Sequence, residues 1–99
     1  MNTHRVVITG VGLSSPIGDS LEAVSASLRE NRGGVIRMEG WEKLNGLSTR
    51  LGAVCKTDLT VLPKKRTRTM GRVALLSTWA TAKAIEDAHI SQELLSNTR

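Results

Sequence analysis

The feature that most constrains this chain is an uncharged stretch, Val73–Ala82, inside a segment predicted to be one long helix. These residues span nearly three helical turns. A helix without a charged side chain on any face has no clearly solvated face and needs neighbours on all sides. We therefore expect this helix to be buried, and other elements must be present to cover it.

A second segment, Val6–Leu13, is also expected to need neighbouring elements that cover it. It is nearly continuous in apolar and small residues and lacks the alternation of a half-exposed strand. This pattern predicts a central strand of parallel type, covered on both faces.

A helix is predicted next, because Asp19 and Glu22 form a start resembling a capping box. It is expected to run to about Glu30 and to stop at Asn31–Gly34. Its apolar face is predicted from three residues at helical spacing, Leu21, Val24 and Leu28.

The middle of the chain offers little further cover. Val35–Thr49 has no sustained period and is predicted to be a loop, Arg50–Lys56 a strand, and Leu59–Lys65 an irregular segment. These parts do not close a core around the long helix. The chain is therefore expected to be the opening portion of a larger domain, or to be completed by another chain, because exposed apolar surface forfeits about 25 cal/mol per Å².

Capping residues set the limits of the long helix. Thr67 or Thr69 is expected to cap its start, and the helix should reach about Ala88. His89 then suits a C-terminal cap or a left-handed conformation, and Ser91 is expected to start one more short turn.

Composition limits the class of protein. With 99 residues, 39% of them hydrophobic, the chain is one domain at most, treated as a single segment 1–99. Its single cysteine permits no internal disulfide, which favours a reducing compartment, and we expect a cytoplasmic protein. No stretch approaches the roughly 20 apolar residues of a membrane span, so no membrane partner is expected.

No catalytic, metal or cofactor site is predicted. Gly10 and Gly12 suggest a dinucleotide-binding turn, but Ser15 stands where a third glycine belongs and Pro16 lacks an N–H donor. Close packing of the glycines is the favoured interpretation. Cys55 is expected to be a buried structural thiol. One Cys and two distant His give no metal-ligand spacing.

The clearest charged feature precedes the long helix, where Pro63–Arg72 holds five basic residues with no acid from Leu59 to Ile85. Three interpretations stay open: a solvated charge run, a nucleic-acid patch, or a docking surface for an acidic protein. No aromatic residue lies within the cluster to stack on bases, which disfavours nucleic acid.

Several segments in order resemble the N-terminal part of β-ketoacyl-[acyl carrier protein] synthases, most closely the type II elongating enzymes: Arg5–Gly18, Gly33–Ile36, Arg68–Arg72 and Ala84–Ala88. The resemblance implies a thiolase-like α/β/α/β/α fold, of which this chain supplies the opening elements. It also implies a decarboxylative Claisen condensation of an acyl thioester with malonyl-carrier protein, in fatty acid or polyketide biosynthesis. A cysteine and two histidines do this work in the family, in motifs that lie downstream of Arg99.

The same resemblance implies that Lys65 and Arg68, flanked by Lys64 and Arg66, contact acyl carrier protein. Cys55 and the two His match no catalytic motif, so the chain alone is expected to be catalytically incomplete. Its expected partners are acyl carrier protein and the remainder of the synthase or a second chain, with a homodimer once complete. The alternative is a free-standing basic module that binds an acidic protein or nucleic acid.

Overall fold

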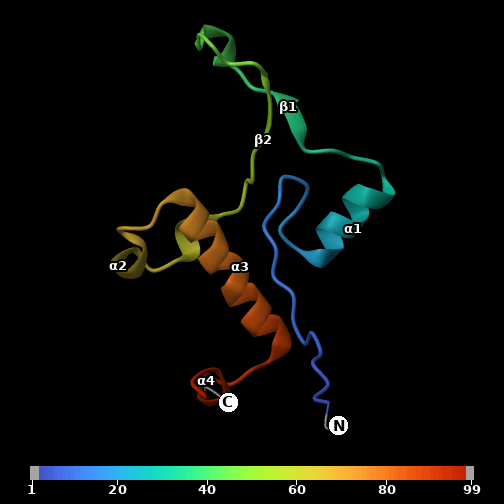
Figure 1. Ribbon diagram of the computed structural model, residues 1–99, viewed down its shortest axis with the longest axis vertical. Coiled ribbons are helices and arrows are strands. Elements are labelled where there is room, and N and C mark those ends of the chain that lie inside the picture. The colour runs from blue at the N-terminus through green and yellow to red at the C-terminus, as the bar shows by residue number, and fades with distance from the viewer. Residues whose placement is uncertain (1–2, 98–99) are drawn as a thin grey trace. The chain divides into compact units, whose positions relative to one another are not determined.

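The computed structural model describes residues 3–97 and divides the chain into two compact units (Figure 1). Unit 1 combines the N-terminal segment up to Leu13 with the chain from Leu59 onward, and unit 2 is Ser14–Asp58. Among the described residues, Trp79 is the only large hydrophobic side chain that is buried. The small core agrees with the expectation that these elements do not close one.

The main element of unit 1 is helix α3, Arg72–Ala88. It ends as predicted, because His89 adopts a left-handed conformation with φ 57° and ψ 35°. Its start differs from the prediction, since Gly71 is the N-cap and no side chain caps the helix. Thr67 is unavailable as a cap because it belongs to the preceding helix and donates its hydroxyl to the Pro63 carbonyl.

One side of α3 is covered and the other is open. Trp79 is 8% exposed, and the short 3₁₀ helix η2, Leu59–Val61, packs against α3. Val73, in contrast, is 80% exposed, and Ser77 and Thr81 also face solvent. The prediction of a helix buried all round is therefore wrong for this chain, which leaves an uncharged helix side without cover.

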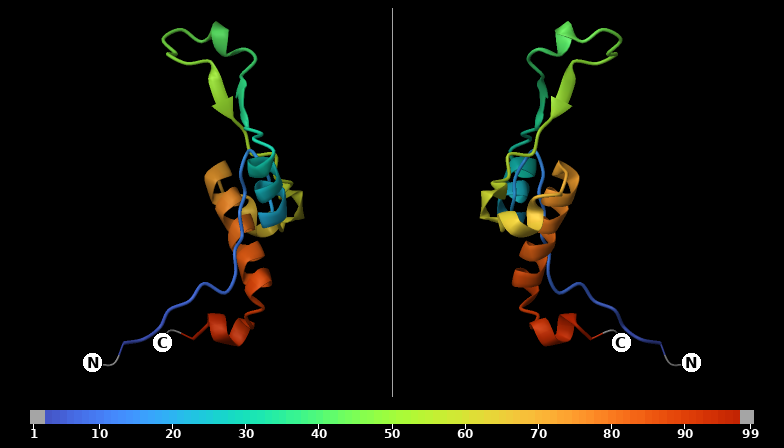
Figure 2. Two further views of the ribbon diagram at one scale, coloured as in Figure 1. Left: turned by 90° about the vertical axis from the view of Figure 1, so that its right-hand side faces the viewer. Right: turned by 90° about the vertical axis from the view of Figure 1, so that its left-hand side faces the viewer.

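The predicted central strand, Val6–Leu13, is not a strand in this structure. Val6 and Ile8 are 92% and 88% exposed. A strand needs a hydrogen-bonded neighbour, and among residues 3–97 the paired strands lie in unit 2. The segment is extended, and its glycine-containing end lies beside α3 (Figure 2).

Glycine permits that contact with α3. A Cβ atom on Gly10 would stand 2.4 Å from the Ala84 carbonyl oxygen, and one on Gly12 would stand 1.9 Å from that of Ala80. The Val11 N–H also donates to the Asp87 carboxylate at 2.9 Å. The close-packing interpretation of the glycines is confirmed, with helix α3 as the surface that they approach.

In unit 2, helix α1 is Leu21–Arg29, and its N-cap is Ser20 rather than the predicted Asp19. The Ser20 hydroxyl accepts from the Ala23 N–H at 3.1 Å. Asp19 accepts instead from the Thr57 hydroxyl, which also bonds the Ser14 hydroxyl. Because the Asp19 carboxylate is engaged across the unit, the neighbouring serine takes the cap.

For α1, the predicted end of the helix is confirmed, whereas the predicted burial of its apolar face is wrong. The helix stops where expected, with Asn31 in a left-handed conformation at φ 55°. The predicted apolar face is not buried, since Leu21 is 62% and Leu28 68% exposed and Val24 is half-buried. Ser27 is the buried residue of the helix, and its hydroxyl donates to the Ile17 carbonyl at 2.8 Å.

The region predicted as a loop contains one strand of a hairpin. Strand β1, Val35–Arg37, pairs antiparallel with β2, Leu51–Ala53, which lies inside the predicted strand. A 3₁₀ helix, η1, Trp41–Lys43, lies in the connection. Single-sequence periodicity failed at β1 because three residues are too few to show a period.

A small apolar cluster supports this hairpin. The Trp41 ring and the Met38 side chain both approach Gly52 so closely that a Cβ atom there would stand 3.1 Å and 2.9 Å from them. The Arg50 guanidinium donates to the Trp41 carbonyl at 3.2 Å. Beyond this cluster both strands lie largely exposed, and an isolated two-stranded hairpin is marginal in water.

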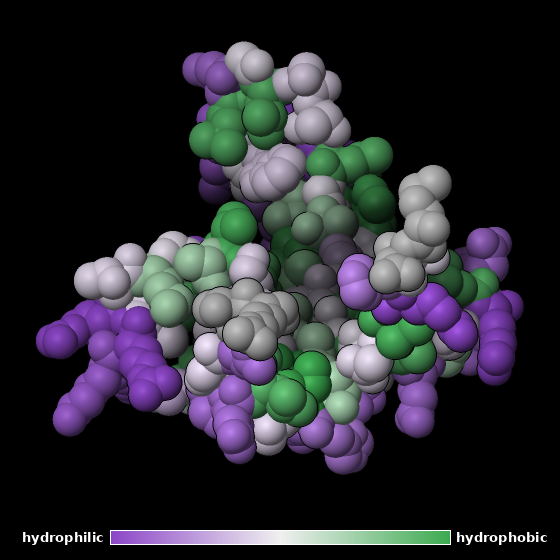
Figure 3. Space-filling model, turned by 60° about the horizontal axis from the view of Figure 1, so that its bottom comes forward, coloured by the Kyte–Doolittle hydropathy of each residue, from purple (hydrophilic) through white to green (hydrophobic). Residues whose placement is uncertain are grey.

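We expect the 99-residue chain on its own to self-associate and to melt without a cooperative transition. Hydrophobic side chains reach the surface among hydrophilic ones (Figure 3), and large ones are exposed in both units: Val6, Ile8, Leu28, Val35 and Val73. Exposed apolar area of this kind favours association. Light scattering and thermal melting test this, and a monomer with a two-state melt would contradict it.

Candidate functional site

The most distinctive surface of the chain is a single helical turn, α2, Lys64–Thr67. Pro63 precedes it with φ −62° and ψ 120°, and its carbonyl accepts from the N–H groups of Arg66 at 3.0 Å and Thr67 at 3.2 Å. The Thr67 hydroxyl donates to the same carbonyl at 3.1 Å. Three hydrogen bonds to one oxygen thus define a turn that has too few residues to be stable by propensity.

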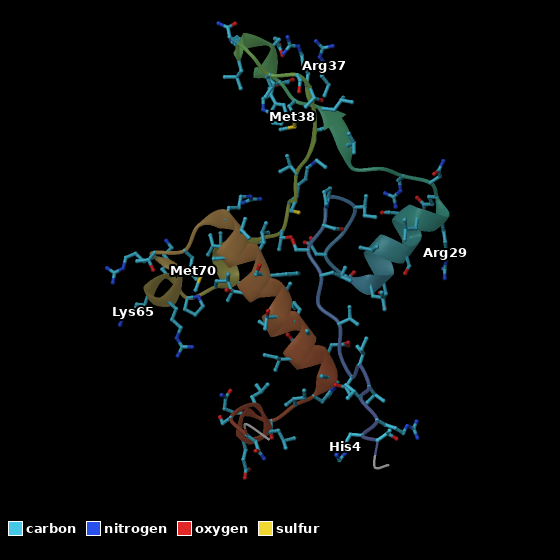
Figure 4. All side chains as sticks on the ribbon, viewed as in Figure 1. His4, Arg29, Arg37, Met38, Lys65 and Met70 are labelled. Atoms are coloured by element: carbon cyan, nitrogen blue, oxygen red, sulfur yellow. The ribbon has the colours of Figure 1, made fainter. Side chains whose placement is uncertain are left out.

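The inner side of α2 is attached to helix α3. Met70 is half-buried, its N–H donates to the Thr67 carbonyl at 2.9 Å, and the Thr78 hydroxyl lies 3.8 Å from its sulfur. Figure 4 shows Met70 between α2 and α3, with Lys65 on the outer side of α2, directed away from α3. The cluster is therefore held on the long helix.

Helix α2 and the residue directly after it carry four exposed cations, which we call the basic patch: Lys64, Lys65, Arg66 and Arg68. Arg32 forms an ion pair with Glu30, and Lys83 forms one with Glu86, and neither of these pairs involves the patch. Cations without acidic neighbours are well suited to bind carboxylates or phosphates.

Charge is distributed unevenly between the two units. Unit 2 holds six basic and six acidic residues, whereas unit 1 holds eight basic and three acidic ones. The whole formal charge of +5 therefore belongs to unit 1, where the basic patch supplies half of the basic residues. A concentrated charge of this kind steers an oppositely charged partner toward the patch.

The other candidate residues form no site. Cys55 is half-buried rather than buried, because it follows the exposed end of β2. His4 is exposed, and Nδ1 of His89 lies 2.9 Å from the Asp87 carbonyl oxygen. Within the described part of the chain, no group of three or more His, Cys, Asp or Glu could hold a metal ion. No helix described here is both long and apolar enough to span a bilayer.

Sequence reasoning missed two contacts that position the elements. Thr57 is 7% exposed and donates to Asp19 at 2.8 Å, a partner 38 residues away. Met70 meets Thr78 across the start of α3. A threonine or methionine carries no local signal for such contacts, whereas the four cations were visible as a run of one charge.

Comparison with known proteins decides the family. The N-terminal domain of β-ketoacyl synthases matches residues 3–99. The chain belongs to the β-ketoacyl synthase family. It is 35% identical over 91% of its length to 3-oxoacyl-[acyl-carrier-protein] synthase 1 of Buchnera aphidicola, and 34% identical over 94% to the synthase 1 of Escherichia coli.

A solved β-ketoacyl synthase from Burkholderia phymatum is similar in structure over 92% of this chain, with a TM-score of 0.80 and 34% sequence identity. The expected fold class is confirmed: the chain is the N-terminal part of a thiolase-like α/β fold. It spans 22% to 23% of the length of these relatives. The exposed side of α3 and the unpaired segment before Gly10 agree with a fold that continues beyond the elements present here.

Proposed function

We propose that this chain serves as the N-terminal part of a 3-oxoacyl-[acyl-carrier-protein] synthase in fatty acid or polyketide chain extension, in the cytoplasm. The observation that carries the proposal is the match of nearly the whole chain to synthases of this name. In the reaction, malonyl-carrier protein loses carbon dioxide, and the resulting carbanion attacks an acyl thioester held on the enzyme. A carbon–carbon bond forms, and the enzyme thiol is released.

The role proposed for the basic patch is to dock acyl carrier protein, a partner that the relatives' names contain. Its support is physical. Four exposed cations lie in and directly after one turn that is anchored on α3, and the sequence holds no acid from Leu59 to Ile85 to compete for them. Complementary charges accelerate encounter and select the partner more than they add affinity.

The residues of this chain do not supply the condensing chemistry in the proposal. An acyl-accepting thiol needs a neighbouring base or cation to lower its pKa. Cys55, His4 and His89 match none of the catalytic motifs that the family resemblance implies. The proposed contribution of the chain is therefore to the fold and to carrier docking.

We expect the 99-residue chain alone to show no condensation of acyl- and malonyl-carrier protein above a buffer control. A hybrid in which residues 3–99 replace the matching segment of the Escherichia coli synthase 1 is expected to condense them. Release of carbon dioxide from labelled malonyl-carrier protein measures both. Turnover by the chain alone that Cys55→Ala abolishes would contradict the first expectation, and a folded but inactive hybrid would contradict the proposed function.

A further inference from the structure

The backbone of α2 assigns a direction to each cation of the basic patch. Residues of an α-helix follow one another by about 100° around its axis. Arg68 retains helical backbone angles, φ −54° and ψ −32°, so it lies almost above Lys64, one turn earlier. Arg66 stands about 160° away from Arg68 around the axis. The two arginines therefore leave the turn on opposite sides.

The attached side of the turn shows which direction is outward. Thr67 is half-buried, hydrogen-bonded to Pro63, and followed by Met70 against α3. Lys65 lies about 160° from Thr67 around the axis, which makes it the outermost residue of the turn. Figure 4 shows Lys65 there, on the side of α2 away from Met70. Arg66 and Arg68 thus stand on the two flanks of an outermost lysine.

The chemistry of the three groups suits this arrangement. A guanidinium presents a planar fork of donors that binds a carboxylate through two parallel hydrogen bonds, whereas an ammonium acts as a compact point charge. Two forks that leave the turn on opposite flanks are better suited to two separate carboxylates than to one. This arrangement favours one carboxylate of the partner on each flank and a negative potential between them, opposite Lys65.

We propose that Arg66 forms a second contact flank opposite Arg68, so that the basic patch fits a carrier-protein surface with a separate carboxylate on each side of Lys65. This inference rests on the proposed function of the patch. It makes Arg66 a residue that determines which carrier proteins are accepted. A carrier with acids on the Arg68 flank alone would engage Lys65 and Arg68 but not Arg66.

The test uses the hybrid synthase and pairs two variants of equal charge change, Arg66→Glu and Arg68→Glu. Each is expected to slow association with acyl carrier protein about tenfold at low salt. Each exposed acid of the carrier is then changed to Lys in turn. A carrier variant that restores association to Arg66→Glu is expected to leave Arg68→Glu unrestored, and the converse. Arg66→Lys, which keeps the charge and loses the fork, is expected to raise the dissociation rate severalfold with little effect on association.

Other outcomes distinguish a failure of the second contact flank from a failure of carrier docking by the basic patch. Slow association for Arg68→Glu with wild-type rates for Arg66→Glu would overturn the second flank and leave carrier docking standing. Restoration of both variants by the same carrier substitution would also overturn it, since the two arginines would then act as one diffuse field. Wild-type association for both variants and for Lys65→Glu would contradict carrier docking itself. Self-acylation by a small thioester confirms that each variant is folded.

Discussion

Reversing Lys65 and Arg68 together to Glu is expected to lower kcat/KM of the hybrid synthase for carrier-bound substrates about 100-fold, because like charges then face each other across the contact. Both side chains are exposed, and neither belongs to the Arg32–Glu30 or Lys83–Glu86 ion pair, so reversing their charge leaves those two contacts in place. Self-acylation by a small thioester needs no protein docking and is expected to change less than about twofold, within the range of surface substitutions.

Salt supplies an independent measure of the same contact. At physiological ionic strength, exposed charges are screened over about 8 Å, so the wild-type advantage over the double variant should shrink as salt rises. Lys43→Glu is a control for charge reversal outside the basic patch, because Lys43 is an exposed cation of unit 2, and its change in formal charge is half that of the double variant. Equal losses on carrier-bound and small substrates would show that the patch supports the fold. Unchanged rates on both would make it a solvated charge run.

The predictions that succeeded depend on neighbours in the chain. His89 ends α3, Asn31 follows the end of α1, and Ser91 caps the short helix α4, Gln92–Leu95, each through bonds within a few residues. The basic patch was also visible from sequence, because a run of cations is a local pattern. The sequence did not show which side of α2 faces inward, because this depends on the contact between Met70 and Thr78.

The predictions that failed depend on distant partners. Val6–Leu13 has the composition of a buried strand, yet a strand forms only where another pairs with it. Asp19 was assigned to cap α1, but Thr57 engages its carboxylate from 38 positions away. The apolar residues of both units nevertheless led to one correct prediction, that the elements of this chain do not close a core. Their exposure in this structure agrees with a chain that matches under a quarter of its relatives' length.

Gly12→Ala is expected to destabilise the hybrid synthase by about 3 kcal/mol. The added methyl group overpacks a contact whose neighbouring atoms cannot shift slightly to make room for it. The added Cβ atom would stand 1.9 Å from the Ala80 carbonyl oxygen and 2.6 Å from the Ala84 nitrogen, and both are helix backbone atoms of α3. They cannot move without breaking the helix. The extended segment must move instead, and the bond from Val11 to Asp87 is then lost.

Gly33→Ala provides the matched control for this substitution. A Cβ atom on Gly33 meets nothing within 4 Å, and Gly33 is absent from the positions with positive φ, so alanine fits without strain. We expect its melting midpoint to equal that of the wild type or to rise slightly, since alanine reduces the entropy of the unfolded chain. Hydrogen exchange at the Val11 amide should accelerate in Gly12→Ala and stay unchanged in Gly33→Ala. Equal melting midpoints and equal exchange rates in the two variants would show that the segment before Ser14 does not pack on α3. The interpretation that Gly10 and Gly12 permit close packing against this helix would then be wrong.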